Sequence, residues 1–370
     1  MNVYQGMSQH PDVSTSVDEA CQSIPDAVDL FIVFSSASYD PDDVLKELQA
    51  RYPSTPVIGC TTSGEYLQGK HYNESIVITG LETPQVDWEI QLIKGLGEFD
   101  STQATDTVNM LLSAHDLDPD NLPYSELFSL LFVDGVSMQE EHVASLLGDA
   151  LDGIPLIGGS AGDDLKFTKT SLYHQSGVHS DAAVLVIGRS THPFKLIKHQ
   201  HLQPSSHRIA VTRADPENRR VYEIDGYPAV VAYARALGVN PEDLSTDNTF
   251  LRPLTIEFNK ELYTRSIQAI HDDQSISFYC AIEEGMVLNV STPTDMVEAL
   301  EEALSDVDAE FMLGCNCILR SLEAKGKDLH DQLGDVIMSH SKNFIAFDTY
   351  GEQHQGLHIN QTFVALAFAS

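Results

Sequence analysis

A polar stretch near the end of the chain contains side chains that could bind a ligand or a metal ion. Residues 347–362 read FDTYGEQHQGLHINQT, and an apolar run over residues 363–368 follows at once. His354 and His358 are four residues apart, a spacing that on a helix would place both rings on one face, as in metal sites. Gly356 between them disfavours that helix, and the sequence shows no third ligand. Two interpretations stay open: a two-histidine metal site or surface histidines.

A second pattern could supply a nucleophile. Ser160 lies within residues 158–162, which match the G-x-S-x-G spacing of hydrolases, where the serine sits on a sharp strand-to-helix turn. Two carboxylates, Asp163 and Asp164, follow it, and no helical pattern begins there. Adjacent carboxylates are unfavourable neighbours for the oxyanion that such a serine would form. We favour a tight turn that needs small residues, and the acidic residues also disfavour a phosphate ligand.

Two other patterns place polar side chains in strand-like or apolar surroundings. His199 and His201 alternate in a strand-like segment, so both rings would face one side, either a cavity or water. Arg320 follows the run CNCIL, and a buried arginine needs a carboxylate or a ligand anion. Glu352 is its expected partner, because both residues follow strands of the same predicted repeat.

These residues are positioned by a unit that the sequence uses three times. Each copy predicts a strand, a helix, a second strand, a turn that ends in an acidic residue, and a third strand. The turns read TTSGE at residues 61–65, SAGDD at 160–164 and DTYGE at 348–352. The polar stretch near the end of the chain therefore contains the third of these turns. We predict layered α/β (α+β) domains built from this repeated unit.

Helix-start signals support the helices of the first two copies. Asp40 before Pro41 is typical of an N-cap followed by proline at the first helical position. Ser137 and Glu140 have the spacing of a capping box, which predicts that the second helix begins directly after Ser137.

A segment with a different pattern separates the second copy from the third. It predicts several short strands and a helix over residues 228–237 that ends at Gly238. The charged run near residues 212–222 marks the expected domain boundary. We therefore expect a polar N-terminal lead-in at residues 1–27, a first domain at 28–215 and a second domain at 216–370.

Composition narrows the classes of partner. Lys and Arg number 21 and Asp and Glu number 55, which gives a net charge of −34. This charge disfavours nucleic-acid and anionic-membrane surfaces, because phosphates would be repelled. No apolar run approaches the roughly 20 residues of a membrane-spanning helix. Without a signal-peptide pattern, and with five scattered cysteines, we expect a cytoplasmic protein; a homo-oligomer stays open.

Six segments in order resemble the FIST family of bacterial sensory proteins. They read VIGCTTSGE, IGGSAGDD, VYEIDGYPA, EEGMVLNV, LGCNCILR and FDTYGEQHQGLHINQTF, and they span most of the chain. The resemblance implies a FIST N-type domain at residues 28–215 and a FIST C-type domain at 216–370. It also implies a signal-transduction sensor of a small ligand that is not an enzyme. Its partner would be a histidine kinase or a cyclic-di-GMP enzyme.

The C-terminal segments are most similar to the branch described as nitric-oxide-sensing haemoproteins. That resemblance implies non-covalently bound haem b with a histidine ligand to the iron. His358 lies within the matching segment and ranks first as the ligand, His201 second and His207 third. Five further polar residues are expected to contact the bound ligand: Arg320, Tyr350, Glu352, Gln353 and Asn360.

Two alternatives stay open beside the haem sensor. The first is a FIST sensor of an amino acid or other small metabolite, in which Arg320 holds a carboxylate and Glu352 an ammonium group. The second is a serine hydrolase that uses Ser160.

Overall fold

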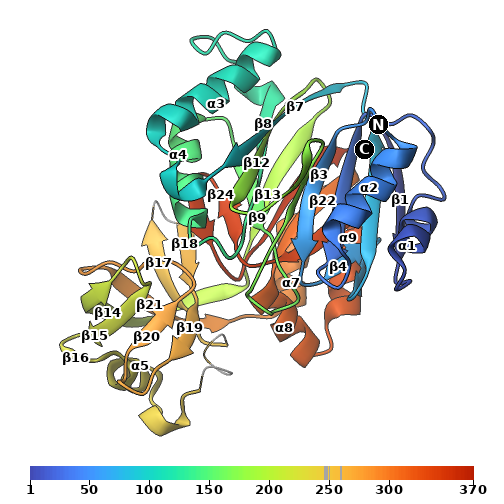
Figure 1. Ribbon diagram of the computed structural model, residues 1–370. Coiled ribbons are helices and arrows are strands. Elements are labelled where there is room, and N and C mark those ends of the chain that lie inside the picture. The colour runs from blue at the N-terminus through green and yellow to red at the C-terminus, as the bar shows by residue number, and fades with distance from the viewer. Residues whose placement is uncertain (246–248, 250, 259–260) are drawn as a thin grey trace. The chain divides into compact units, whose positions relative to one another are not determined.

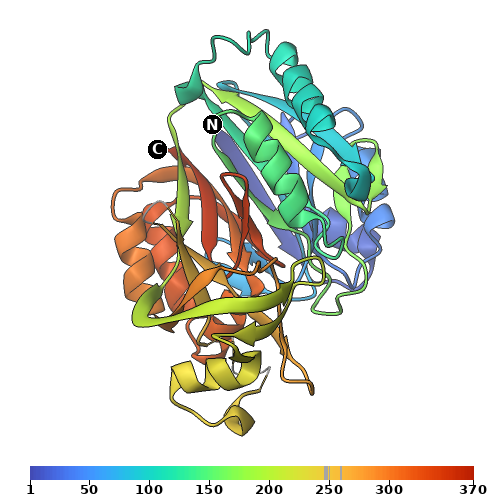
Figure 2. The ribbon, with the colours of Figure 1, turned by 90° about the vertical axis from the view of Figure 1, so that its left-hand side faces the viewer.

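The computed structural model describes residues 1–245, 249, 251–258 and 261–370. Within this part the chain has the predicted mixed α/β class and divides into two compact units (Figures 1 and 2). The first unit contains residues 1–199, 301–358 and 363–370. The second contains residues 200–300 and 359–362.

The three predicted copies are all present, and each is longer than the sequence indicated. An additional strand and helix precede every first strand. The first copy consists of β1 (Asn2–Ser8), α1 (Val13–Ala20), β2 (Leu30–Ser36), α2 (Pro41–Arg51), β3 (Val57–Thr62), β4 (Glu65–Leu67), β5 (Lys70–Tyr72) and β6 (Ile76–Glu82). The second consists of β7 (Val86–Lys94), η1 (Leu96–Glu98), α3 (Ser101–Ala114), η2 (Tyr124–Glu126), β8 (Leu127–Val133), α4 (Glu140–Ala150), β9 (Leu156–Ser160), β10 (Leu172–His174), β11 (Gly177–His179) and β12 (Ala182–Ser190).

The third copy is interrupted by most of the second unit, which enters after its first strand. It consists of β13 (Phe194–His199), α7 (Met296–Leu304), β22 (Ala309–Cys317), α8 (Ile318–Gly326), α9 (His330–His340), β23 (Phe344–Thr349), β24 (Glu352–His354), β25 (Leu357–Ile359) and β26 (Phe363–Ala369). The interruption begins and ends on paired strands, because Leu202 lies opposite Pro293. Because the two ends of the inserted segment lie opposite each other, the insertion does not separate the parts of the third copy that precede and follow it.

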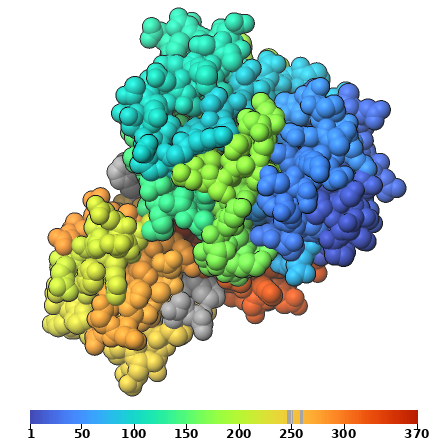
Figure 3. Space-filling view, viewed as in Figure 1, coloured from blue at the N-terminus to red at the C-terminus, as the bar shows by residue number. Residues whose placement is uncertain are grey.

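The three copies exchange their hairpins. Each copy contributes four strands to a six-stranded sheet. The strand orders are β1-β6-β2-β3-β10-β11, β7-β12-β8-β9-β24-β25 and β13-β26-β22-β23-β4-β5. The last two strands of every sheet belong to a hairpin from another copy. Hairpin β4–β5 of the first copy joins the third sheet, β24–β25 of the third joins the second, and β10–β11 of the second joins the first. Figure 3 shows the green second copy lying against the blue first copy.

Complementary residue sizes fill the core beside the parallel strand pairs. In the register, Phe34 lies beside Cys60, Phe132 beside Gly159, and Cys315 beside Phe347. Each pair thus has one aromatic ring and one small residue. The ring centroids of Phe34 and Phe347 are 4.4 Å apart, and that of Phe132 lies 6.0–6.1 Å from both. Because a packed core leaves no spare volume, these pairs fix how closely the three sheets approach.

The described residues of the second unit form an eight-stranded antiparallel sheet covered by helix α5. Its path is β18-β17-β21-β14-β15-β20-β19, with β16 paired to β15. The elements are β14 (Leu202–Asp215), β15 (Arg220–Ile224), β16 (Tyr227–Pro228), α5 (Ala229–Leu237), η3 (Pro241–Asp243), β17 (Leu254–Phe258), β18 (Glu261–Arg265), β19 (Ile267–Ile270), β20 (Ile276–Phe278) and β21 (Val287–Pro293). Helix α5 buries Val230 and Tyr233 against the sheet. Gly238 ends it in a left-handed conformation, as predicted.

The compact units divide the chain differently from the expected domains. The expected boundary after residue 215 falls in the turn between β14 and β15, inside the second unit. Residues 1–27, expected to be a polar lead-in, form β1 and α1, and β1 pairs with β6 along its whole length.

The predicted start of α2 is confirmed, and the predicted start of α4 is wrong. Asp40 caps α2, since its side chain accepts hydrogen bonds from the amides of Asp42 and Asp43. Ser137 does not cap α4, which begins at Glu140. The Ser137 hydroxyl instead donates to the carbonyl of Asp134 at 2.8 Å and so closes a turn before the helix.

Candidate functional site

The polar stretch that ends the chain is the third of the exchanged hairpins. Its turn places Gln355 and Gly356 at positive φ angles of 50° and 79°. The first hairpin uses Gln68 and Gly69 in the same way, with φ angles of 49° and 75°. A tight two-residue turn of this type needs positive φ at both positions. Gln355 and Gly356 of the polar stretch thus form the hairpin turn.

The acidic residue at the start of both hairpins is buried and hydrogen-bonded. Glu352 is fully buried, and the Thr349 hydroxyl donates to it. Glu65 has the same relation to Thr62 and also accepts from Ser75. Burial raises the pKa of Glu65 to about 8, although both hydroxyl groups act to lower it. These acids have a structural role in both copies.

Gln353 and His358 meet Ser160 at the end of β9. The Gln353 side-chain amide donates to Ser160 Oγ at 2.9 Å, and the same nitrogen lies 3.3 Å from His358 Nδ1. All three side chains are buried, and Gln353 Oε1 has no hydrogen-bond partner. Ser160 is the last residue of β9, and a loop rather than a helix follows it. The strand-to-helix elbow of a serine hydrolase is therefore missing at Ser160.

Tyr350 closes the loop that follows Ser160. Its ring stacks on Phe167 with centroids 4.4 Å apart, and its hydroxyl donates to Asp163. Burial alone would raise the pKa of Asp163. The hydrogen bonds from Tyr350 and from the backbone amides of residues 167–169 outweigh burial and lower it below its ordinary value. Tyr350 thus holds a loop in place.

The remaining predicted residues lie in different units. Arg320 is on α8 of the first unit, is 2% exposed, and has its pKa lowered by burial to about 10. Tyr66 and Glu323 act to raise that pKa, and Glu352, the expected partner, does so less than either. His201, His207 and Asn360 belong to the second unit, where His207 is exposed and His201 and Asn360 are buried.

A polar network that the sequence interpretation missed lies at the ends of β22 and β23. Asp348, fully buried, accepts hydrogen bonds from the Tyr66 hydroxyl at 2.9 Å and the Asn316 amide at 2.8 Å, and lies 2.9 Å from His71 Nε2. His330 stacks on His71 at 4.3 Å between ring centroids. Burial lowers the pKa of His330, and the neighbouring His71 lowers it further. The signal was present in the sequence, because EYLQGKHY at residues 65–72 aligns with EQHQGLHI at 352–359.

The described residues of the first unit do not fit a haem at His358. The ring is 3% exposed and so has no open face on which a haem could lie. The cavity in the second unit and a small one beside His192 are lined by none of the three candidate histidines. Within the described part of the chain, no group of three His, Cys, Asp or Glu side chains is arranged to hold a metal ion.

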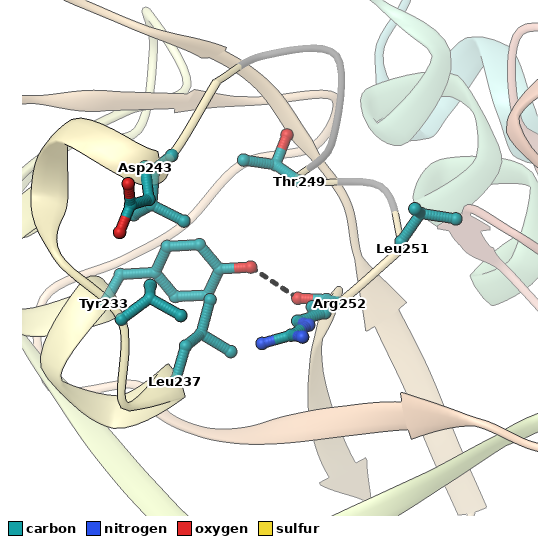
Figure 4. A pocket seen from close by; sticks show the side chains of 8 residues that line it. Tyr233, Leu237, Asp243, Thr249, Leu251 and Arg252 are labelled. Atoms are coloured by element: carbon teal, nitrogen blue, oxygen red, sulfur yellow. Dashed lines mark hydrogen bonds between the residues drawn. The ribbon is translucent and has the colours of Figure 1, made fainter.

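A cavity of about 280 Å³ lies in the second unit, at the end of α5 (Figure 4). Polar and apolar atoms share its wall about equally, and it is lined by Tyr233, Leu237, Val239, Asp243, Leu244, Thr249, Leu251 and Arg252. Pockets for drug-sized ligands start at about 300 Å³, so this one suits a smaller molecule.

Arg252 is the cation in the wall of the cavity. Its backbone carbonyl accepts a hydrogen bond from the Tyr233 hydroxyl at 2.5 Å. Figure 4 shows its guanidinium directed toward Tyr233 and Leu237. Among the described residues, the guanidinium has no hydrogen bond and no ion pair. The Asp243 carboxylate accepts instead from the side chain of Asn240 at 3.1 Å. The cavity therefore presents a cation that no described group pairs with, beside leucine side chains.

The chain thus combines a repeated α/β scaffold with a cavity whose size suits a small molecule and whose wall carries both Asp243 and Arg252. Residues 29–227 match the FIST N domain, and residues 229–355 match the FIST C domain. The chain belongs to the FIST family, whose domains are sensors of small ligands in signal transduction.

The chain also resembles a protein of Methanocaldococcus jannaschii described as uncharacterized. The two are 27% identical over 220 residues, which cover 56% of this chain and 40% of that protein. In the part of the chain that the structure describes, no helix is both long and apolar enough to cross a membrane.

Proposed function

We propose that this chain is a signal-transduction sensor that binds a small carboxylic acid in the cavity of its second unit. The observation that supports the proposal is the Arg252 guanidinium, which no described group pairs with, at the wall of a cavity that also contains leucine side chains. A guanidinium binds a carboxylate through two parallel hydrogen bonds. The leucine side chains would cover the apolar body of the acid. The ligand is thus a small metabolite, as in the haem-free alternative, but bound by Arg252 instead of Arg320 and Glu352.

Thermal unfolding in the presence of a panel of small carboxylic acids tests this function. A specific ligand stabilises the folded state in proportion to its saturation, and the matching acid should raise the midpoint by about 3 °C or more. Arg252→Gln should remove that rise. Arg235→Gln is the matched control, because Arg235 lies on α5, does not line the cavity, and has its guanidinium 5.8 Å from the Tyr227 ring.

Two outcomes contradict the proposal. No acid of the panel stabilises the wild-type protein, or both arginine variants lose the effect equally. All samples need equal ionic strength, because added salt alone screens a chain of net charge −34.

The haem-based nitric oxide sensor stays a prediction of the family resemblance. The burial of the His358 ring does not support it. An absorption spectrum of protein expressed with haem supplied, before and after nitric oxide, tests it directly. A Soret band that shifts with the gas and changes in His358→Ala would establish this function; colourless protein would leave the metabolite sensor.

The proposed partner enzyme rests on the sensor role of the chain and not on a contact in the structure. As a sensor, the chain would change the activity of a histidine kinase or a cyclic-di-GMP enzyme when its ligand binds. A pull-down of such enzymes that depends on the acid and fails with Arg252→Gln would support this step.

A further inference from the structure

Three consecutive residues of hairpin β4–β5 contact the N-terminal half of α9. At the first, Gly69, the backbones touch, since a Cβ on Gly334 would lie 1.7 Å from the Gly69 carbonyl oxygen. At the second, the Lys70 ammonium lies 2.7 Å from the Asp331 carboxylate, and both side chains are exposed. This pairing raises the pKa of Lys70 and lowers that of Asp331. Neither contact therefore changes its charge between about pH 5 and 7.

The third contact is a pair of stacked histidine rings. His71 of β5 and His330, the first residue of α9, have ring centroids 4.3 Å apart and ring planes 25° apart. His71 Nε2 lies 2.9 Å from the Asp348 carboxylate, and His330 Nε2 lies 3.2 Å from the Ser321 hydroxyl. Both rings are thus held in the stacked position, one from the hairpin and one from the helix.

The stack can hold one proton more easily than two. A proton on His71 would lie beside the carboxylate of Asp348, which is fully buried. A proton on His330 would lie over the His71 ring, and like charges so close repel, more strongly where water is excluded. Burial lowers the pKa of His330, and the neighbouring His71 lowers it further. The stacked form therefore resists a second proton.

Other charged or titratable groups of the first unit surround the pair and its contacts. They are Tyr66, Lys70, Arg320, Lys325, Asp331, Asp335 and Asp348. Asp348 acts to raise the pKa of His330, and Lys325 acts to lower it. Tyr66 stays neutral, because burial raises its pKa well above the ordinary value. With all of these groups present, the pKa of His330 lies below the ordinary 6.5.

We propose that the stacked rings of His71 and His330 form a pH-sensitive latch, which holds the tip of hairpin β4–β5 against α9 and releases it in acid. When the tip separates from α9, His330 enters water and binds a proton near its ordinary pKa of about 6.5. Opening thus takes up a proton. The opening equilibrium should rise by up to about tenfold for each pH unit below 6.5, until the stacked form is protonated too.

Hydrogen–deuterium exchange from about pH 5.0 to 7.5 tests the latch. The informative peptide contains Gln68, whose amide ties the hairpin tip to the Phe344 carbonyl at 3.0 Å. His330→Phe keeps a flat ring over His71 and removes the titrating group. The ratio of protection in the wild type to that in His330→Phe cancels the intrinsic pH dependence of exchange. It also cancels the titration of Glu65, which lies in the same hairpin and is present in both chains.

We expect this ratio to stay constant above about pH 7 and to fall by up to about 30-fold between pH 6.5 and 5.0. His340→Gln is the matched control, because His340 ends the same helix but contacts the Val307 carbonyl and Glu301. It should keep the pH dependence of the wild type. His330→Gln, which keeps a hydrogen-bonding partner for Ser321, gives the same comparison without a phenylalanine.

Nuclear magnetic resonance of the imidazole protons supplies a second readout. His330 should titrate below pH 6.5 in the wild type, over the same range in which protection is lost. His71→Gln keeps a hydrogen-bond donor for Asp348 but removes the second titrating ring. It should move the titration of His330 upward, because the neighbouring His71 no longer opposes the proton.

Three results would overturn the proposal. The protection ratio stays constant down to pH 5.0; His340→Gln removes the pH dependence as fully as His330→Phe; or His330 titrates at or above pH 6.5 in the folded wild type. The latch lies wholly in the first unit and goes beyond the ligand-binding function proposed for the second. Arg252→Gln should therefore keep the latch, so that a failure of either proposal is distinguishable from a failure of the other.

Discussion

Glu65 stays protonated in the folded protein near neutral pH. It is fully buried, and burial raises its pKa to about 8, against 4.5 for an ordinary glutamate. Its two hydrogen-bond donors, Thr62 and Ser75, are neutral hydroxyls and do not offset the loss of water. Glu65 therefore makes the stability of the first unit depend on pH.

We predict that the stability of the protein falls as pH rises from about 4.5 to 8. In this window the unfolded chain has released the Glu65 proton and the folded protein still holds it, so each step up in pH favours unfolding, by up to about 1.4 kcal/mol per unit. Glu65→Gln keeps the size of the side chain and should flatten this dependence. Urea unfolding at several pH values measures it, with exposed Glu98→Gln as the control. An unchanged slope in Glu65→Gln would contradict the assignment.

Tyr66 and Tyr173 occupy equivalent positions in two exchanged hairpins, yet they bond different acceptors. The Tyr66 hydroxyl reaches the buried Asp348 carboxylate at 2.9 Å, whereas that of Tyr173 lies 2.7 Å from the Ser35 hydroxyl. A hydrogen bond to a buried charge contributes more than one between neutral groups.

We predict that Tyr66→Phe lowers the free energy of unfolding by about 2–3 kcal/mol and Tyr173→Phe by about 1 kcal/mol. Both substitutions remove one hydroxyl group from an equivalent position. A difference between the two losses of stability therefore does not come from the lost volume. Chemical denaturation of both variants at neutral pH measures the difference. Equal losses would mean that Asp348 gains no particular support from Tyr66.

Single residues of the site could be predicted only where their role is local. The acid at each turn was visible in the sequence, and so was the need of Arg320 for charged surroundings. The likeness of residues 65–72 to 352–359 pointed to His71, but not to Asp348, which His71 and Tyr66 reach from the first copy across more than 270 residues of chain. Arg252 carries no sequence signal, since what marks it is the lack of a partner among the described residues.

Two hairpin turns pack directly on helices through paired glycines. A Cβ on Gly334 of α9 would lie 1.7 Å from the carbonyl oxygen of Gly69, and one on Gly148 of α4 would lie 2.4 Å from the Cα of Gly356. The exchanged hairpins therefore approach the helices at backbone contact distance.

We predict that Gly334→Ala destabilises the protein by about 2 kcal/mol or more, although alanine ordinarily stabilises a helix interior by about 1 kcal/mol. The added methyl group forces hairpin β4–β5 away from α9. Gly326→Ala is the control, because Gly326 is also a helical glycine, the last residue of α8, and has open space around it. It should be neutral or stabilising in thermal unfolding. A stabilising Gly334→Ala would show that the hairpin is not held against the helix.

The elements themselves were largely predictable and their pairing was not. Apolar runs marked the central strands of each copy, and Asp40 marked a helix start. The partner of each hairpin depends on contacts far apart in the sequence, which local pattern does not encode. The predicted helix start at Ser137 was wrong because a serine before a helix can also hydrogen-bond a preceding turn. Ser137 does so with the carbonyl of Asp134.

At the scale of the whole molecule, the first unit is one interlocked body with a second unit inserted into it. Each of its sheets needs strands from two copies. A fragment that ends at residue 227, where the FIST N match ends, lacks β22 to β26. It leaves β9 without its hairpin partner and hairpin β4–β5 without a sheet.

We predict that this fragment, residues 1–227, does not fold on its own. A chain in which residues 203–292 are replaced by a short Gly-Ser linker should keep a folded first unit, because Leu202 and Pro293 lie opposite each other. Circular dichroism and the cooperativity of thermal unfolding compare the two. If the fragment folds and the deletion variant does not, the first unit does not need strands from all three copies, and the prediction is wrong.

The sequence indicated the three copies but not that they form a single body. The charged run near residue 215 has the composition of a domain linker, and it is a β-turn within the second unit. Exposed hairpin turns and domain linkers favour the same polar residues, so composition alone does not separate them.

Native mass spectrometry of the intact chain, equilibrated with haem and the panel of carboxylic acids together, tests the central claim most directly. The account predicts a wild-type species with a bound acid that is absent from Arg252→Gln and present in Arg235→Gln. A haem-bound wild type that loses the haem in His358→Ala, with no acid bound, would contradict it.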